Sequence, residues 1–364
     1  MNDANRMNWR NTLLTKLLNI QYPIVQGPFG GGMSAIALTT AVSNLGGLGS
    51  YGCQPSTPDE IIQLSRDIRK ITDKPFNLNL WVYDRDERLK TFDHVAYEKL
   101  KLLFKPYFDE LSVPLPEMPT DLGPKYADQV QAILDAKPPV FSFVFGIPSE
   151  SILEKCRSNG TKTIGAATTV DEAIALEKAG VDAVVATGFE AGGHRVSFLR
   201  DAEDSLTGIF SLIPQVADSI SIPIIAAGGI ADARGIKAAL TLGADAVQIG
   251  TAFLATKQSN ITDAHRHGLF SPEAKYTTLT KLFSGRLARG IRSKLTQELK
   301  GQDHLLAPYP MQSKFLSTLR TSLIKNDKAE YITFWSGQSA PLIKHRDVTE
   351  LFSYLVEETD TLYS

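Results

Sequence analysis

Short apolar runs recur along the chain, and most are separated by segments whose apolar residues recur three and four positions apart. A short continuous apolar run bounded by glycine or polar residues is typical of a strand that is buried on both faces. Eight such strands are predicted, at residues 23–26, 48–51, 76–81, 140–145, 162–166, 183–187, 222–227 and 246–249. This alternation predicts an α/β fold, and eight repeats are the number that closes a (β/α)8 TIM barrel. An open doubly wound sheet is the alternative.

Local signals mark where several helices begin. Capping boxes are predicted at Thr57-Pro58-Asp59-Glu60 and at Thr169-Val170-Asp171-Glu172. Ser34 is the candidate cap of a helix whose apolar face recurs at helical spacing through residues 38–45. A short amphipathic segment at 12–18 precedes the first strand, and we expect it to cover the closed end of the barrel.

Two stretches interrupt the regular alternation. Residues 83–139 are rich in charge, aromatic residues and proline, which predicts a helical insertion. The chain beyond residue 255 is too long for one closing helix, so we expect a C-terminal helical cap over the barrel mouth, with residues 335–338 as its most loop-like part. A final amphipathic helix is predicted at 348–356. The predicted division is therefore a barrel at 1–255, with an insertion at about 83–139, and at 256–364 a cap that returns to the barrel.

Composition and charge exclude several classes of partner. Of the 364 residues, 43% are hydrophobic and 21% are charged, which is ordinary for a globular protein. The net charge of −2 gives no reason to expect nucleic acid or an anionic membrane as partner. No apolar run approaches the roughly 18 residues of a membrane span, and the polar N-terminus lacks a signal-peptide core. We expect a small-molecule substrate and either a monomer or a homodimer.

The cysteines and the potential metal ligands of the sequence predict no further site. Cys53 and Cys156 are far apart and outside any CxxC spacing, which is typical of a protein of the reducing cytoplasm. We interpret both as small apolar residues rather than nucleophiles. Histidine, cysteine and acidic residues do not cluster at metal-ligand spacing, so no metal site is predicted.

The most informative stretch is Val184–Arg195, which begins as a buried strand and breaks into a loop. Three glycines in this loop, Gly188, Gly192 and Gly193, precede His194. Glycine lets the backbone approach a ligand closely. In many enzymes the active site is formed by a loop of this kind, which follows a rigid strand and carries a titratable side chain.

In a barrel, the loops that follow the strands all face one end, where the active site lies. The residues at the predicted strand ends are therefore the candidates for a site. They are Gly27-Pro28-Phe29, Asn79, Gly146, Thr168, Thr187–His194, Gly228-Gly229 and Gly250-Thr251.

The last two strand ends have the composition of a phosphate site. Loops after strands 7 and 8 of a barrel commonly bind phosphate through backbone N–H groups and the N-terminus of a following helix. Gly228-Gly229 leaves the backbone uncovered, and Gly250-Thr251 adds one hydroxyl donor. Tight-turn glycines of a barrel without a ligand are the alternative.

Taken together, these residues resemble the nitronate monooxygenases, formerly called 2-nitropropane dioxygenases, which are FMN-dependent (β/α)8 barrels. The run Glu190-Ala-Gly-Gly-His194 is the most specific feature of the resemblance. The similar segments span most of the chain and are Pro23–Gly32, Asn79, Gly188–His194, Ala226–Ile230, Gln248–Thr251, Ser284–Gly290 and Trp335–Gln338.

The resemblance implies an FMN cofactor and assigns His194 as the catalytic base that removes the α-proton of a nitroalkane. It places the FMN phosphate on Gly228, Gly229, Gly250 and Thr251, and the flavin ring near Gly27, Asn79 and Gly192. Thr187, Gly193 and Gln248 complete the implied cofactor-binding set. The family often has Gln where Thr187 stands, and Ala-Pro-Met in place of Gly27-Pro28-Phe29.

Other functions share parts of this pattern. An FMN- and NAD(P)H-dependent enoyl-thioester or quinone reductase would use the same barrel, and a non-catalytic flavin-binding protein would need only the cofactor loops. A purine-nucleotide dehydrogenase needs a nucleophilic cysteine after a late strand, and neither cysteine lies there. Gly47-Leu-Gly-Ser-Tyr-Gly52 matches G-x-G-x-x-G, but it follows a predicted helix rather than a strand, so it does not indicate an NAD site.

Overall fold

The computed structural model describes residues 9–82 and 87–364, so the predictions for the N-terminus and for the first residues of the insertion lie outside the described part. A parallel eight-stranded sheet forms the centre, in the order β1-β9-β8-β6-β5-β4-β3-β2. Its strands are β1 (Ile24–Gln26), β2 (Gly49–Gly52), β3 (Phe76–Trp81), β4 (Val140–Val144), β5 (Lys162–Ala167), β6 (Ala183–Thr187), β8 (Ile224–Ala227) and β9 (Ala246–Ile249).

The two edges of this sheet meet. Val25 of β1 forms a parallel bridge with Leu48, next to β2. The Leu48 N–H donates to the Ile24 carbonyl at 3.0 Å, and the Gln26 N–H donates to the Leu48 carbonyl at 2.9 Å. The predicted (β/α)8 barrel is therefore confirmed, and the open sheet is excluded. All eight predicted strands are present, each within two residues of its predicted bounds.

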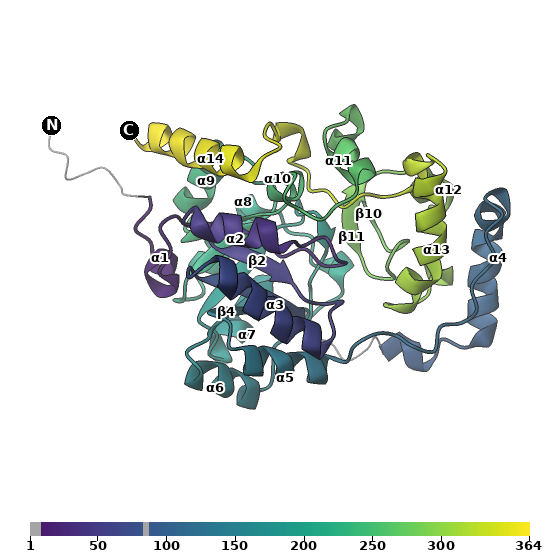
Figure 1. Cartoon of the computed structure of the whole chain (residues 1–364), viewed down its shortest axis with the longest axis horizontal. Helices are drawn as coiled ribbons and strands as arrows, with labels where there is room; N and C mark the ends of the chain where they lie inside the picture. The colour runs from purple at the N-terminus through teal and green to yellow at the C-terminus, as the bar shows by residue number, and fades with distance from the viewer. Residues whose placement is uncertain (1–8, 83–86) are drawn as a thin grey trace, which may run out of the picture.

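Helices cover the outside of the barrel (Figure 1). They are α2 (Ile36–Asn44), α3 (Pro58–Ile71), α5 (Tyr126–Ala136), α6 (Glu150–Ser158), α7 (Val170–Lys178), α8 (Ile209–Ala217), α9 (Ala233–Thr241) and α14 (Val348–Tyr363). The C-terminal α14 packs between α9 and α2 and so completes the ring. The segment between β9 and α14 is thus an insertion into the eighth strand-helix unit.

The short helix α1 (Leu13–Leu18) closes one end of the barrel, as predicted. Its buried Leu14 and Leu18 pack against apolar side chains from inside the barrel, including Val140 and Ile225. Because this end is filled by side chains, a ligand can enter only from the opposite end, where the strands terminate.

The predicted helix starts are partly confirmed. Thr57 and Glu60 form the expected reciprocal capping box at the start of α3. At α7, Thr169 Oγ1 accepts from the Glu172 N–H at 3.2 Å, but the Glu172 carboxylate points elsewhere. It accepts from the N–H groups of Phe198 and Leu199 at 2.6 and 3.0 Å. Glu172 therefore ties the loop that follows His194 to the barrel, instead of closing a capping box.

The prediction that Ser34 caps α2 is wrong, because the N-cap is Ala35. The Ser34 hydroxyl donates to the Phe29 carbonyl at 2.8 Å and accepts from the N–H groups of Phe29 and Gly52. These bonds fold the glycine-rich loop after β1 back onto β2. Ser34 thus shapes a loop at the open end of the barrel.

The insertion and the C-terminal segment pack together beside the barrel. In Figure 1, α11 (Asp263–Leu269), α12 (Lys294–Glu298) and α13 (Met311–Lys325) lie on one side of it, and α4 (His94–Glu110) lies outside α13. Phe315 of α13 joins the two segments, with its ring 5.4 to 5.8 Å from the rings of Tyr97, Phe104 and Phe108 of α4. We propose that the chain divides as predicted into a barrel and a cap, and that α14 returns the chain from the cap to the barrel. Helix α5 lies within the predicted insertion, but it packs on α3 of the barrel.

The cap also contains strands that the hydrophobic pattern did not predict. β10 (Thr277–Thr280) and β11 (Ala288–Ile291) form an antiparallel sheet with β7, which is only Gly193–His194. His194 pairs with Ala288, and Gly193 pairs with Arg289. The backbone of the candidate catalytic residue is thereby joined to the cap. The remaining short elements are α10 (Thr251–Leu254), η2 (Glu87–Lys90), η3 (Ala202–Asp204), η4 (Pro272–Lys275), η5 (Asp303–Leu305), η6 (Ala329–Tyr331) and η7 (Ala340–Leu342).

Within residues 9–82 and 87–364, no helix combines the length and the apolar character that crossing a bilayer requires.

Candidate active site

A cavity of about 750 Å³ lies between the open end of the barrel and the cap. This volume is within the usual range for a site that binds a small molecule or a cofactor. The eleven residues assigned from the sequence to catalysis or cofactor binding all line it, whereas the strand-end candidates Gly146, Thr168, Gly188, Phe189 and Glu190 do not. The eleven are His194, Gly27, Asn79, Thr187, Gly192, Gly193, Gly228, Gly229, Gln248, Gly250 and Thr251.

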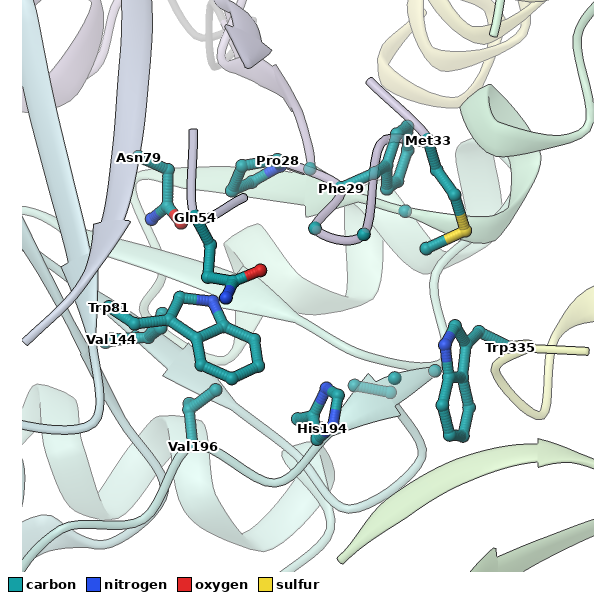
Figure 2. A pocket seen from close by; sticks show the side chains of 18 of the residues that line it. Pro28, Phe29, Met33, Gln54, Asn79, Trp81, Val144, His194, Val196 and Trp335 are labelled. Atoms are coloured by element: carbon teal, nitrogen blue, oxygen red, sulfur yellow. The ribbon is translucent and has the colours of Figure 1, made fainter. Parts of the chain in front are cut away.

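His194 lies between two tryptophans (Figure 2). Its ring centroid is 5.0 Å from that of Trp81, at the end of β3, and 5.5 Å from that of Trp335, in the cap. Figure 2 shows Pro28 and Phe29 across the cavity from His194. Trp335 therefore lies at the cavity, as expected for the loop-like part of the cap.

Ser284 contacts one nitrogen of the His194 ring. His194 Nε2 lies 2.8 Å from Ser284 Oγ, and the Arg286 carbonyl lies 3.1 Å from the same oxygen. When the single hydroxyl proton bonds that carbonyl, Ser284 Oγ accepts a hydrogen bond from His194 Nε2–H. In this neutral tautomer Nδ1 has the free lone pair and can act as the base.

The surroundings of His194 keep its imidazole uncharged. Burial and, second, the nearby Arg286 guanidinium lower the pKa of His194 from 6.5 to about 3. The Arg286 guanidinium carbon lies 4.2 Å from the ring centroid of Phe145 and 5.2 Å from that of Tyr309, so aromatic faces hold this cation beside the histidine. His194 is therefore a neutral proton acceptor throughout the physiological pH range.

A second buried histidine holds Trp335 in place. His265 of α11 is 2% exposed, and its Nε2 lies 2.9 Å from the Trp335 carbonyl. Its ring stacks on Phe334 at a centroid distance of 4.9 Å. Burial is the main reason that the pKa of His265 is lowered to about 4. His265 thus donates its proton to the backbone and fixes the indole that faces His194.

The loop that carries His194 is anchored by the next residue, Arg195, which is 1% exposed. Its guanidinium donates to the carbonyls of Thr187 at 3.1 Å, Gly188 at 2.7 Å and Ser205 at 2.6 Å. A buried arginine that binds three carbonyls holds both ends of the loop at fixed positions. The sequence analysis missed this role because the pattern of the loop gave no reason to bury a charged residue.

The glycines after β8 and β9 form an uncovered backbone surface. Gly228 and Gly229 have φ values of +108° and +69°, which side chains disfavour, and the Gly229 N–H has no acceptor among the described residues. Asp232 caps α9, so the N-terminus of that helix is already occupied. The free donors at this end of the cavity are therefore backbone N–H groups and the hydroxyl of Thr251, whose oxygen accepts from the Gly337 N–H at 2.9 Å.

Polar side chains on β3 and β4 form a second group. Ser142 Oγ accepts from the side-chain amides of Asn77 at 2.8 Å and Asn79 at 2.9 Å. Asn77 Oδ1 is buried and has no hydrogen-bond partner among the described residues, although it belongs to the cavity wall. The sequence analysis named only Asn79. The two-residue period of Asn77-Leu78-Asn79 on one strand was the available signal, since it places both amides on the same face.

The two cysteines are not reactive groups of this site. Both are buried, and burial raises the pKa of Cys53 to about 12 and that of Cys156 to about 11. Both thiols are therefore protonated and unreactive at neutral pH. In the described ranges, no group of three or more His, Cys, Asp or Glu side chains is arranged to hold a metal ion.

A closed β/α barrel with a cavity at its open end and a neutral histidine in the cavity wall has the architecture of a barrel enzyme. The family model described as nitronate monooxygenase matches residues 11–358. A protein of Staphylococcus haemolyticus named probable nitronate monooxygenase is 38% identical, over 97% of this chain and 98% of its own length. The chain belongs to the nitronate monooxygenase family and is an oxidoreductase.

Solved structures agree with this assignment. The nitroalkane oxidase of Streptomyces ansochromogenes is similar with a TM-score of 0.86 and 34% identity, covering 96% of this chain and 99% of that one. The structure named FabK from Thermotoga maritima is similar with a TM-score of 0.73 and 29% identity, over 97% of each chain. Both similarities extend over nearly the whole of this chain.

The lowered pKa of His265 predicts how stability depends on pH. Below pH 6.5 the unfolded imidazole takes up a proton, whereas the folded one stays neutral until about pH 4. The free energy of unfolding should therefore decrease on acidification across this window, by about 1.4 kcal/mol per pH unit from this residue. His265→Gln should remove that part of the slope in denaturant titrations at several pH values. The exposed His267 on the same helix is the control, and equal slopes for His265→Gln and His267→Gln would contradict the prediction.

Proposed function

We propose that this chain is an FMN-dependent enzyme that oxidises alkyl nitronates with molecular oxygen and releases nitrite. Neutral nitroalkanes are included as substrates, after loss of their α-proton. The observation that carries the proposal is the neutral His194 imidazole, with a free Nδ1, in the wall of a cavity whose opposite parts are bare glycine backbone. Family membership supports the same reaction class. The two buried thiols fit the reducing cytoplasm, which we propose as its compartment.

The residues present fit an FMN cofactor. Positive φ angles at Gly228 and Gly229 keep this surface free of side chains, and a Cβ at Gly192 would lie 2.5 Å from the Gly337 nitrogen. We assign the phosphate to backbone N–H groups of Gly228, Gly229, Gly250 and Thr251, and to the Thr251 hydroxyl. The unpaired Asn77 Oδ1 adds an acceptor for a buried N–H group. Gly27, Asn79, Thr187, Gly192, Gly193 and Gln248 would surround the ring.

FMN, when bound, supplies the redox chemistry with oxygen; the protein handles the proton and the orientation. His194 Nδ1 takes the α-proton of a neutral nitroalkane, and the resulting imidazolium faces the nitronate anion. Because an adjacent anion raises the pKa of an imidazole, the substrate itself makes this weak base effective. Trp81 and Trp335 confine the site on both sides of His194 and exclude bulk water.

The phosphate assignment predicts that Gly229→Glu abolishes FMN binding. The substitution would place a carboxylate where the phosphate is expected, next to Glu190, whose Cβ would be 3.4 Å from the new Cβ. Absorbance in the flavin bands after purification and reconstitution is the measurement. Gly160→Glu is the matched control, because Gly160 has a similar φ of +74°, with no atom within 4 Å of an added Cβ, and lies outside the cavity. Retention of FMN by Gly229→Glu would refute the assignment.

The main alternative is an NAD(P)H-dependent flavin reductase, because the same barrel can serve that function. One anaerobic experiment separates the two functions. The flavin of the purified protein should stay oxidised with excess NADPH or NADH and should bleach on addition of a nitronate. Rapid bleaching by a nicotinamide nucleotide would favour the reductase. A flavin that neither reagent reduces would favour a non-catalytic binding protein.

The proposed role of His194 as a base predicts that its replacement affects a neutral nitroalkane and the corresponding nitronate differently. His194→Asn should reduce activity on a neutral nitroalkane by about 10²- to 10⁴-fold, the usual cost of removing a general base. Activity on the pre-formed nitronate should fall much less, since that anion has already lost its proton. Oxygen consumption with each form is the measurement, and the exposed His304→Asn is the control. Equal losses on both forms would mean that His194 only binds the substrate.

A further inference from the structure

The loop that carries His194 begins with a charged residue that the proposed reaction does not use. Glu190 is the first residue of the run Glu190-Ala-Gly-Gly-His194, the most specific motif of the sequence. Its side chain is half-buried, but it does not line the cavity. Glu190 therefore contacts neither substrate nor cofactor, and its role follows from the groups that it binds within the protein.

The Glu190 carboxylate binds the start of α8. Its two oxygens lie 3.0 and 3.2 Å from the Ile209 nitrogen and accept the hydrogen bond of that N–H group. The N-cap residue of α8 is Gly208, which has no side chain that could accept this bond. The first N–H groups of a helix have no partner within the helix, and a carboxylate near them also complements the helix dipole. Glu190 thus caps α8 from a position 19 residues earlier in the chain.

Two glycines leave room for this carboxylate. A Cβ added to Gly188 would lie 2.3 Å from Glu190 Oε2, and a Cβ added to Gly208 would lie 2.9 Å from Glu190 Oε1. Both distances are too short for real atoms, so a side chain at either position would displace the carboxylate from α8. The contact therefore depends on the backbone of both segments that it joins.

The backbone around Glu190 is bound to the cap. The Glu190 carbonyl accepts from the Gln338 N–H at 3.0 Å, and the Phe189 carbonyl accepts from Arg289 Nε at 2.8 Å. Arg289 also pairs with Gly193 through the short sheet between β7 and β11. The cap thus holds both ends of the segment 189–193, and the side chain of Glu190 joins the same segment to a helix of the barrel.

We propose that Glu190 is a positioning residue for proton transfer, because its bond to Ile209 fixes the segment that carries His194 relative to the barrel. This inference rests on the proposed function, since it takes His194 as the base that removes the α-proton. Proton transfer requires a set distance and direction between the imidazole and the substrate, and a displacement of about 1 Å can reduce a rate about 100-fold. A pre-formed nitronate does not need this step.

Replacement of Glu190 tests the proposal through one ratio, kcat/KM for a neutral nitroalkane divided by kcat/KM for its pre-formed nitronate. Glu190→Ala should reduce this ratio about 10- to 100-fold, because loss of the bond to Ile209 displaces the base. Glu190→Gln should keep the ratio within about threefold of the native value, since its amide oxygen can accept the same hydrogen bond. General structural damage would reduce both activities alike and leave the ratio unchanged.

The matched control is Glu177→Ala. Glu177 Oε1 also accepts from a distant backbone N–H group, that of Ser221 at 2.6 Å, but Glu177 lies on α7 and outside the cavity. This variant should leave the ratio unchanged. Equal ratios for the native enzyme and Glu190→Ala would overturn the proposal. Equal reductions of the ratio by Glu190→Ala and by either Glu190→Gln or Glu177→Ala would also overturn it.

FMN content separates the support of the base from the support of the cofactor. Alanine keeps the Cβ of Glu190, which is the atom of that side chain nearest to a Cβ built on Gly229. Glu190→Ala should therefore retain FMN, with native absorbance in the flavin bands. Loss of FMN from Glu190→Ala, with FMN retained by Glu177→Ala, would overturn the proposal, because Glu190 would then support the phosphate turn.

Hydrogen exchange separates the failure of this proposal from failure of the proposed reaction, because it needs no turnover. In the FMN-loaded protein, Glu190→Ala should accelerate exchange of the amides of residues 188–194 and of Ile209 by at least about tenfold, since their local opening becomes easier. Glu190→Gln and Glu177→Ala should not. Unchanged exchange in Glu190→Ala would overturn the proposal. Accelerated exchange would support the positioning of His194 by Glu190, even if the native protein oxidised no nitronate and the proposed reaction were refuted.

Discussion

The pairing of β7 with β11 is the contact on which the site depends. Two residues, Gly193 and His194, leave the barrel and join a sheet that belongs to the cap. Arg195 fixes the ends of this loop, and the pairing with β11 fixes the backbone of His194 between them, where glycine would otherwise permit several conformations. Through this pairing, the backbone of His194 is aligned with the strand that follows Ser284, and Ser284 is the residue that orients the imidazole. The cap therefore does more than cover the cavity, since it also sets the direction of the base.

Electrostatics follow from the same arrangement. The cap brings Arg286 beside His194 and removes both from bulk water, and each effect favours the neutral imidazole. A neutral histidine has a free lone pair at neutral pH, which an exposed histidine has only in part. The same surroundings make the cavity receptive to anions, because its lining contains lysine and arginine but no aspartate or glutamate. Removal of a proton turns the substrate into an anion, and a cavity without carboxylates accommodates that anion.

Much of the fold could be predicted from the sequence, because each barrel strand is a short apolar run that can be recognised locally. Residues such as Asn79, Gly228 and Thr251 could be placed at one site for the same reason, since parallel strands end at a common face. The bond between His194 and Ser284 joins residues 90 positions apart, and the contact of His265 with the Trp335 carbonyl joins residues 70 positions apart. No local pattern encodes such contacts. The capping signal at Thr169 correctly marked the start of α7, but the Glu172 carboxylate accepts from Thr168 and from the N–H groups of Phe198 and Leu199 instead of from the Thr169 N–H.

The position of α14 affects how the chain can fold. The last helix of the barrel ring lies after the whole cap, so α9 and α2 lack their common neighbour until residues 348–363 have been synthesised. During synthesis the emerging barrel would expose the apolar surface that Leu351, Phe352 and Leu355 later bury. Docking of α14 closes the cap as one long loop. The entropic cost of closing this loop grows only slowly with the length of the loop. For folding of the barrel, as distinct from formation of the site, large changes within the cap should therefore be tolerated more readily than loss of α14.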